Sequence, residues 1–242
     1  MNIILLFEKD FISQSKVRLE DRRHYHILSI LKATKGSILK VGMLNGERGV
    51  AETISINAKD TMLELTLNQP PPPPLPLNLI LAFPRPKILR RVIQCCTSMG
   101  VKNIALIRTW KVEKSYLQSP YAQKENLFED MILGLEQAGD TILPDIKVFP
   151  LFKPFIEDCL DAFSTEGQRI LAHPNACRAC PVGVNKPLTL AIGPEAGFIP
   201  YEIAQFEKNK FSAVSIGERI LRVDQAVPAL IGRLMTGAHS GG

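Results

Sequence analysis

Two loops that begin with glycine, each directly after a short apolar run, are the part of this 242-residue chain whose pattern best suits chemistry. Residues 188–192 lead into the loop 193–198, and residues 213–216 lead into the loop 217–222. The apolar runs predict buried strands, so both loops would leave the carboxyl ends of strands, where α/β sheets bind small ligands. Glycine lets a backbone approach a ligand closely, so backbone N–H and C=O groups could recognise the ligand directly. This favours a cofactor with an uncharged head group. Gly-Pro turns after strands are also common without any ligand, so the pattern alone leaves both interpretations open.

Several familiar site motifs are missing from the sequence. Neither G-x-x-x-x-G-K-[ST] nor G-x-G-x-x-G occurs, which argues against nucleoside-triphosphate and dinucleotide chemistry. Cys177 and Cys180 form a single C-x-x-C pair with no second pair to complete a zinc site, so we expect no metal. No apolar run approaches the roughly 20 residues that cross a bilayer, and the N-terminus does not read as a signal peptide. We therefore expect a cytoplasmic protein with no membrane partner.

The basic residues are unevenly distributed along the chain, whose net charge is +5. No acidic residue occurs between Glu64 and Glu113, while seven basic residues fall in that stretch. Such a bias suits a polyanionic partner, although a solvated helix face would look similar. Our candidates for contacting the phosphates of such a partner are Arg85, Lys87, Arg90 and Arg91, together with Arg22, Arg23, His26 and Lys32 from a second basic cluster.

A proline run at residues 70–76 marks the clearest boundary, because it can enter neither a helix interior nor a central strand. We expect residues 1–69 and 77–242 to form two domains joined by a polyproline linker. The alternative is a proline-rich surface loop inside one domain.

The two expected domains differ in their patterns. Residues 1–69 predict a small β-barrel, with strands at 38–42, 49–56 and 62–67 and one helix at 20–31. Residues 77–242 alternate apolar runs with amphipathic stretches, which predicts an α/β domain with a parallel sheet. Its strands are expected at 77–83, 103–108, 169–173, 188–192 and 213–216, and its helices at 88–99, 121–138, 200–208 and 224–235.

Together these motifs resemble one known family. The string Ile-Gly-Pro-Glu-Ala-Gly-Phe at 192–198 and the string Gly-Glu-Arg-Ile-Leu-Arg at 217–222 resemble the bacterial 16S ribosomal RNA uridine-N3 methyltransferases of the SPOUT class. His-Ile-Leu-Ser-Ile-Leu-Lys at 26–32, Pro86-Lys87 and Leu-Glu-Gln-Ala-Gly at 135–139 fall in the family's order. The resemblance implies a PUA-like, RNA-binding barrel followed by a SPOUT domain with a C-terminal trefoil knot. It also implies a homodimer that uses S-adenosylmethionine to methylate 16S ribosomal RNA or the small ribosomal subunit.

Carried over by position, the resemblance assigns a cofactor pocket to three loops. Its residues would be Leu171, Ala172, His173, Ile192, Gly193, Pro194, Glu195, Gly197, Ser215, Ile216, Gly217, Ile220, Leu221 and Arg222.

Methylation of uridine N3 requires that nitrogen to lose its proton. A general base could be Glu195 or Asp224, while Arg222 could stabilise the developing uridine anion, and we favour the electrostatic role of Arg222. Glu195 could instead cap the helix that begins near Pro200 or pair with the backbone.

Six positions depart from the family's usual pattern. Ala196 replaces glycine, Lys32 and Asp140 each replace arginine, and Val-Asp-Gln at 223–225 replaces Thr-Glu-Thr. These changes leave open a catalytically silent RNA-binding or ribosome-assembly factor on the same scaffold. A SPOUT methyltransferase for another RNA is the nearer alternative.

Overall fold

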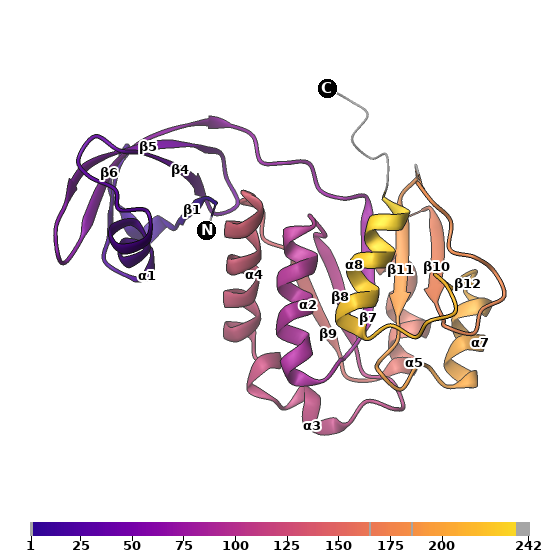
Figure 1. Cartoon of the computed structure of the whole chain (residues 1–242). Coiled ribbons are helices and arrows are strands. Elements are labelled where there is room, and N and C mark those ends of the chain that lie inside the picture. Colours follow the sequence, from indigo (N-terminus) through magenta and orange to yellow (C-terminus); the bar gives the residue numbers. More distant parts are fainter. Residues whose placement is uncertain (1, 165, 185, 236–242) are drawn as a thin grey trace. The chain divides into compact units, whose positions relative to one another are not determined.

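The computed structural model describes residues 2–164, 166–184 and 186–235, and the chain divides into two compact units (Figure 1). The first unit is Met1–Pro73 together with Ile132–Leu143, and the second is Pro74–Met131 together with Pro144–Gly242. The proline-run boundary assigns residues 132–143 to the second domain, whereas in the structure they complete the first unit. The reason is packing, because Leu5 contacts Ile132 and Leu135, and the backbone N–H groups of Asn2 and Ile3 donate to the carbonyl of Glu136.

The first unit is built on a mixed six-stranded sheet with the order β1-β4-β5-β6-β3-β2. In that order the strands are Ile4–Leu6, Ile38–Met43, Arg48–Ile56, Thr61–Gln69, Lys16–Leu19 and Phe11–Ser13. β1 pairs in parallel with β4, and the other pairs are antiparallel. The apolar side chains that alternate along these strands form a core that includes Leu6, Val17, Val41 and Leu63. The sequence predicts β4 to β6 and misses β1 to β3, which are only three or four residues long.

One helical segment lies between β3 and β4. α1 spans Arg22–Tyr25 and continues into a π-helical turn at His26–Ile30, close to the helix expected at 20–31. It begins at Asp21, whose carboxylate accepts a hydrogen bond from the backbone N–H of Arg23.

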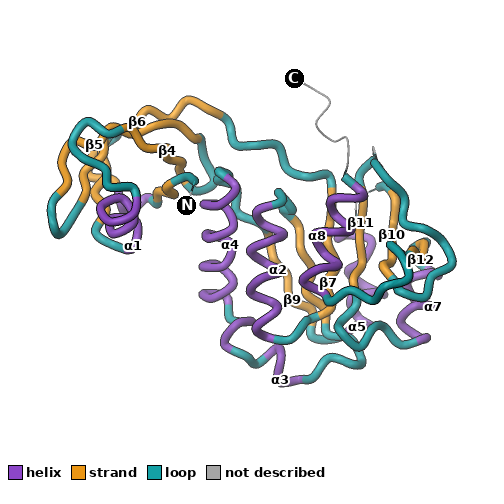
Figure 2. The backbone as a smooth tube through the Cα atoms, viewed as in Figure 1, coloured by secondary structure: helices purple, strands orange, loops and turns teal. Residues whose placement is uncertain are grey.

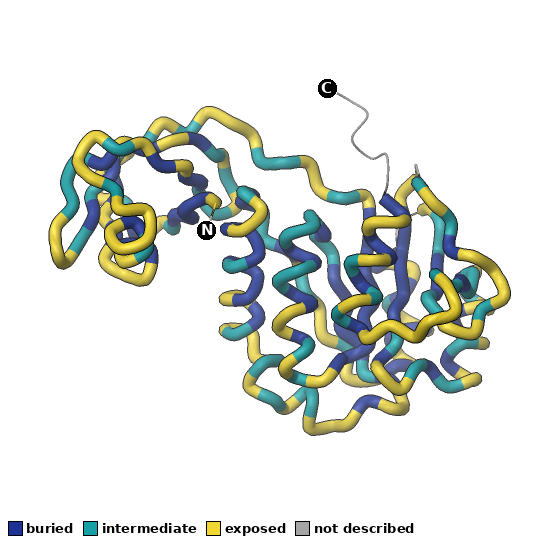
Figure 3. Tube along the Cα trace, in the orientation of Figure 1, coloured by how far each residue is buried: buried dark blue, intermediate teal, exposed yellow. Residues whose placement is uncertain are grey.

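The second unit is built on a six-stranded parallel sheet with the order β12-β10-β11-β7-β8-β9. In that order the strands are Ser212–Val214, Gln168–Ala172, Leu188–Ile192, Leu77–Ala82, Asn103–Ile107 and Asp145–Phe149. The central strands β7 and β11 are buried along their whole length (Figure 3). All five strands predicted for residues 77–242 are present. β9 is not predicted from the sequence because every one of its residues is exposed or half-buried, so it carries no apolar run.

Helices connect the strands of this sheet (Figure 2). They are α2 (Pro86–Ser98), α3 (Lys114–Leu117), α4 (Lys124–Ala138), α5 (Phe152–Pro154), α6 (Leu160–Phe163), α7 (Pro200–Lys208) and α8 (Val223–Leu234). α2 and α8 pack against each other, and α2 buries the apolar stripe that its sequence predicts, including Leu89, Val92 and Ile93. Because all six strands are parallel, their carboxyl ends lie along one edge of the sheet. The loops 193–198 and 217–222, which the sequence identifies as candidate ligand-binding loops, therefore start at this edge.

No helix in the described part of the chain is long and apolar enough to cross a membrane.

Candidate active site

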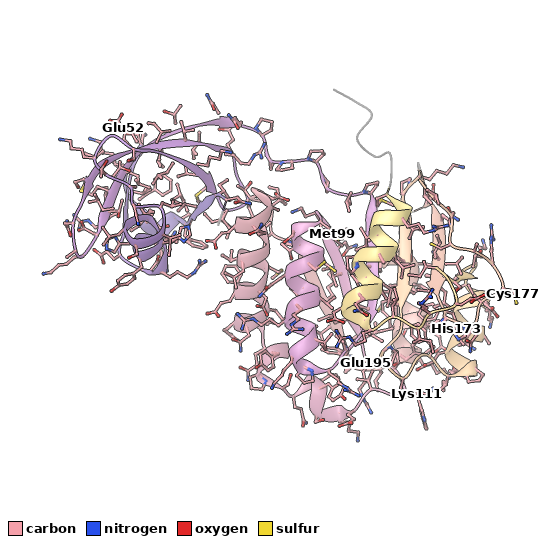
Figure 4. The ribbon with its side chains drawn as sticks, viewed as in Figure 1. Glu52, Met99, Lys111, His173, Cys177 and Glu195 are labelled. Carbon is pink, nitrogen blue, oxygen red and sulfur yellow. The ribbon has the colours of Figure 1, made fainter. Side chains whose placement is uncertain are left out.

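Three loops that leave the carboxyl ends of β10, β11 and β12 surround a cavity of about 340 Å³. Most of the residues predicted to bind a cofactor line it. They are Ala172, His173, Ile192, Gly193, Pro194, Glu195, Gly197, Ser215, Ile216, Gly217, Ile220 and Leu221. Figure 4 shows His173 and Glu195, which come from two different loops, near the same end of the sheet. The sequence motifs are therefore brought together in one place by the parallel sheet.

Two predicted cofactor residues do not line this cavity. Leu171 lies inside β10 and is fully buried, so its side chain supports the strand. Arg222 lines a second, neighbouring cavity.

Two glycines of the first cavity sit where a side chain would be costly. A Cβ on Gly193 would lie 3.1 Å from the ring of Phe198, so a side chain at position 193 would require this ring or the loop to move by a few tenths of an ångström. Gly217 has a φ of 143°, a conformation that residues with a Cβ rarely adopt. Both glycines fix the path of the cavity-lining backbone.

The loops around the first cavity are held by hydrogen bonds to neighbouring segments. Lys111 Nζ donates to the carbonyl of Ala196 at 2.7 Å. The buried carboxylate of Glu202 accepts from the backbone N–H groups of Trp110 at 2.7 Å and Ile199 at 2.9 Å. The carboxylate that caps the helix beginning at Pro200 is therefore that of Glu202, and the expectation that Glu195 could cap it is wrong.

Glu195 pairs with the backbone elsewhere, as the other part of that alternative expects. Its Oε1 accepts a hydrogen bond from the backbone N–H of Arg85 at 3.0 Å. Arg85 precedes the first turn of α2, so Glu195 ties the loop after β11 to the N-terminus of that helix.

The second cavity has a volume of about 510 Å³ and adjoins the first, since Glu195 and Val223 line both. Its other lining residues come from the starts of α2 and α8 and from the segment 114–122. They are Arg85, Pro86, Lys87, Ile88, Tyr116, Tyr121, Arg222 and Asp224.

Asp224 lies between two arginines at this cavity. Its side chain is only 13% exposed, with Oδ1 3.7 Å from Arg222 Nε and Oδ2 3.9 Å from Arg91 Nη1. Within the described parts of the chain, Oδ1 accepts no hydrogen bond. The site therefore presents a half-enclosed carboxylate flanked by cations.

The basic residues of α2 are partly neutralised in space, although the surrounding sequence holds no acid. Arg90 Nε donates to the buried carboxylate of Asp130 at 2.9 Å, and Gln94 donates to the same oxygen at 2.7 Å. Arg85, Lys87 and Arg91 are exposed. The Nε group of Arg90 is thus engaged by Asp130, while Arg85, Lys87 and Arg91 remain exposed to solvent.

Arg23 must be removed from the predicted RNA contacts. Its side chain is 2% exposed, and its guanidinium pairs with Asp10 at 2.6 Å and Asp21 at 2.7 Å. Burial alone would lower the pKa of Arg23, but the two carboxylates raise it above its ordinary value. This arginine is a charged part of the core and is not available to a phosphate.

The other basic candidates of the first unit differ in their surroundings. Arg22 makes two 2.9 Å hydrogen bonds to the buried carboxylate of Glu136, which hold one edge of its guanidinium. Burial lowers the pKa of His26 below its ordinary value, which disfavours the charged imidazole. Lys32 is exposed.

The sequence analysis misses several residues of the two cavities, among them Lys111, Phe198, Arg219, Tyr116 and Tyr121. Phe198 lies within the recognised loop motif and Arg219 within the next, so both could have been found there. Tyr116 and Tyr121 carry no motif, and only the fold brings them to the site. No group of three or more metal-ligating side chains occurs among the residues that the structure describes.

Comparisons with known proteins agree with this architecture. A family model described as RNA methyltransferase domain matches residues 71–235. The Ribosomal RNA small subunit methyltransferase E of Treponema pallidum (strain Nichols) is 32% identical over 247 residues, covering 99% of this chain and 92% of that protein.

Two solved structures share the fold over nearly the whole chain. The first, a Ribosomal RNA small subunit methyltransferase E from Neisseria gonorrhoeae bound to S-adenosyl methionine, superposes with a TM-score of 0.71 at 19% identity, covering 97% of this chain and 98% of that one. The second, a methyltransferase from Legionella pneumophila in complex with SAM, superposes with a TM-score of 0.69 at 19% identity, covering 96% and 98%.

Proposed function

Because the chain belongs to the family of the ribosomal RNA small subunit methyltransferases E, we propose that it methylates ring nitrogen 3 of a uridine in 16S ribosomal RNA, using S-adenosylmethionine. One observation carries the proposal: two cavities adjoin at the carboxyl edge of one parallel sheet and share Glu195 and Val223. Methyl transfer needs donor and acceptor to meet in line, and adjoining cavities allow this. The relatives named as methyltransferases, and the neighbours solved with the cofactor, support the assignment.

The residues of the first cavity fit the cofactor. Its volume of about 340 Å³ lies in the range of small-molecule sites. Apolar side chains such as Ile192, Leu221 and Leu230 suit an adenine ring, and the glycine loops expose backbone groups to its polar edge. Arg219 supplies positive charge for a carboxylate. S-adenosylmethionine, when bound, supplies an electrophilic methyl group, and the electron pair of the broken C–S bond stays on sulfur.

The second cavity supplies the groups that uridine N3 requires. N3 must lose its proton before its lone pair can form the new N–C bond. We assign Asp224 as the proton acceptor, because this residue lines the cavity and its buried Oδ1 accepts no hydrogen bond in the described structure. Arg222, 3.7 Å from Asp224, stabilises the uridine anion as charge develops. Glu195 acts as a positioning residue through its hydrogen bond to Arg85.

RNA is held by exposed cations on both units, among which we place Arg85, Lys87, Arg91 and Lys32. The guanidinium N–H groups of Arg90 and Arg22 that do not pair with Asp130 and Glu136 add to this set. A target base must be presented outside its helix to reach the second cavity.

The finer architecture is also part of the proposal. We propose that residues 1–69 form a PUA-like, RNA-binding barrel, that 70–76 is a linker, and that 77–242 forms a SPOUT domain with a C-terminal trefoil knot, whose segment 132–143 packs into the first unit. In support of the knot, residues 178–184 hydrogen-bond both to Ser215 and to the last turn of α8. We further propose a homodimer that acts in the cytoplasm. Light scattering after gel filtration tests the dimer.

The decisive experiment incubates the protein with labelled S-adenosylmethionine and small ribosomal subunits lacking the modification. The RNA is then digested, and its nucleosides are analysed by mass spectrometry. New 3-methyluridine is the expected result. If a known family member methylates these subunits and this protein does not, another RNA substrate or a catalytically silent RNA-binding protein replaces the proposal.

A further inference from the structure

The second cavity has an aromatic side that the catalytic assignment does not use. Tyr116 belongs to α3 and Tyr121 to the 3₁₀ turn Pro120–Ala122, which packs against α2. Both side chains are half-buried and line the cavity. Among the described residues neither hydroxyl has a hydrogen-bond partner, so both are available to a ligand. These tyrosines are not needed for a cofactor in the first cavity, which they do not line.

The segment that carries the tyrosines is held by hydrogen bonds. Asn126 Nδ2 donates to the carbonyl of Pro120 at 2.8 Å, and the backbone N–H of Ala122 donates to Ser119 at 3.0 Å. A tyrosine has only two side-chain torsions, so an anchored tyrosine loses little entropy when a planar ligand stacks on it. This is the arrangement that proteins use to hold unpaired bases.

The rest of the cavity lining carries more positive than negative charge. The N-termini of α2 and α8 both reach it, through Pro86 and Val223, and helix N-termini attract anions. Arg85, Lys87 and Arg222 add three cations, against the carboxylates of Glu195 and Asp224. Aromatic rings and basic groups that line one cavity match one ligand class, a nucleotide, whose base is flat and whose phosphate is anionic.

We propose that this cavity is the acceptor subsite, in which Tyr116 and Tyr121 stack the target base while Arg85 and Lys87 hold its phosphate. The inference rests on the proposed function, which supplies the RNA substrate, and deepens it by assigning the residues that receive the nucleotide. The stacked base then has its Watson–Crick edge, where N3 lies, toward Arg222 and Asp224.

Variants of the two tyrosines test the assignment by steady-state kinetics on unmodified small subunits. Tyr116→Ala and Tyr121→Ala should each raise KM for the subunits about tenfold, because stacking is lost, and leave the Kd for S-adenosylmethionine within about twofold. Tyr116→Phe and Tyr121→Phe keep the ring and should stay within about threefold of wild type. The matched control is Tyr201→Ala, an exposed tyrosine that lines neither cavity. Alanine variants with wild-type KM would overturn the inference.

Photo-crosslinking gives a second readout that needs neither a variant nor turnover. Wild-type protein is irradiated with 16S RNA transcripts containing 4-thiouridine, and the crosslinked peptides are identified by mass spectrometry. The expected crosslinks fall on the peptide that carries Tyr116 and Tyr121. Crosslinks confined to other peptides overturn the acceptor subsite even if the enzyme methylates RNA. Failure of the proposed function looks different: wild type then makes no 3-methyluridine, while a crosslink at the tyrosines still supports a nucleotide subsite.

Discussion

The carboxylate of Glu195 accepts a hydrogen bond from the backbone N–H of Arg85 at 3.0 Å, which joins the loop after β11 to the start of α2. This bond lies where the two cavities meet, since Glu195 lines both. A carboxylate engaged in this way sets the distance between the cofactor loop and the basic helix. This hydrogen bond is the ground on which we propose a positioning role for Glu195 and assign the proton to Asp224.

Substitution of Glu195 separates positioning from proton transfer. Glu195→Gln keeps an oxygen that can accept the Arg85 hydrogen bond, so kcat should fall by less than about tenfold. Glu195→Ala removes the acceptor and should lower kcat/KM more strongly than Glu195→Gln. Loss of a general base typically costs 10²- to 10⁴-fold, and we expect that loss for Asp224→Asn. Single-turnover methylation rates measure all three. A Glu195→Gln variant as slow as Asp224→Asn would show that Glu195 takes the proton.

A methyl group added at Gly193 tests the shape of the cofactor cavity. The Cβ of Gly193→Ala would lie 3.1 Å from the Phe198 ring and 3.3 Å from the Phe198 nitrogen, so the ring or the loop must move by a few tenths of an ångström. We expect a loss of about tenfold or more in affinity for S-adenosylmethionine by calorimetry.

Gly232→Ala on α8 is the matched control for Gly193→Ala. A Cβ there meets nothing within 4 Å, and alanine favours the helix by up to about 1 kcal/mol. Its cofactor affinity should stay at the wild-type value. Equal S-adenosylmethionine affinities for both variants would show that Gly193 does not border the bound cofactor.

Much of the second unit could be predicted from the sequence because its signals are local. Buried parallel strands are continuous apolar runs, and helix ends are marked by residues such as Gly100 and Gly139. The strands that the sequence does not predict lack such a signal. β9 has no buried residue, and β1 is only three residues long. The loops that line the first cavity carry recognisable motifs, because each lies directly after a predictable strand.

The errors in the site arose where distant residues meet. Arg22 and Arg23 are neighbours in a basic cluster, yet only the fold shows that Asp10 and Asp21 enclose Arg23. Likewise, Asp130 reaches Arg90 from a helix 40 residues away along the chain. Local charge predicts net attraction to RNA, but pairing in space decides which cations remain open.

That difference predicts unequal effects for the basic residues of α2. Lys87 and Arg91 are exposed, so Lys87→Ala and Arg91→Ala should each weaken RNA binding and reduce the salt slope of log K by about one. Arg90→Glu should instead destabilise the fold, because it places a second carboxylate beside the buried Asp130. Filter binding across a salt series measures the slopes, and S-adenosylmethionine affinity serves as the control. Unchanged slopes for Lys87→Ala and Arg91→Ala would refute the RNA-binding role of this face.

Arg23 should be essential to the stability of the first unit. Arg23→Met leaves Asp10, 6% exposed, without its cation, and breaking a buried ion pair in this way costs about 3–5 kcal/mol. Arg18→Met is the control, because Arg18 and Asp60 are 3.7 Å apart at the surface and such pairs contribute about 1 kcal/mol or less. Urea unfolding followed by circular dichroism gives both values. Equal losses for the two variants would mean that the buried pair adds no stability of its own.

Asp21 makes part of this stability depend on pH. Burial would raise the pKa of Asp21, but its hydrogen bonds with Arg23 outweigh burial and hold the pKa below the ordinary value of 3.8. A carboxyl whose folded pKa is lowered adds stability above its unfolded pKa, and that stability is lost as the pH falls through the folded value. Its size is about 1 kcal/mol or less, because the Asp21 side chain is 47% exposed and solvent screens the pair.

Asp21→Asn isolates the charge, because asparagine also caps helices well. The free energy of unfolding of wild type should exceed that of Asp21→Asn at pH 7, and the difference should shrink once the pH drops below 3.8. Urea titrations of both proteins between pH 7 and about pH 2.5 measure it. A difference that stays constant over this range would mean that Asp21 stabilises α1 as a cap, independently of its charge.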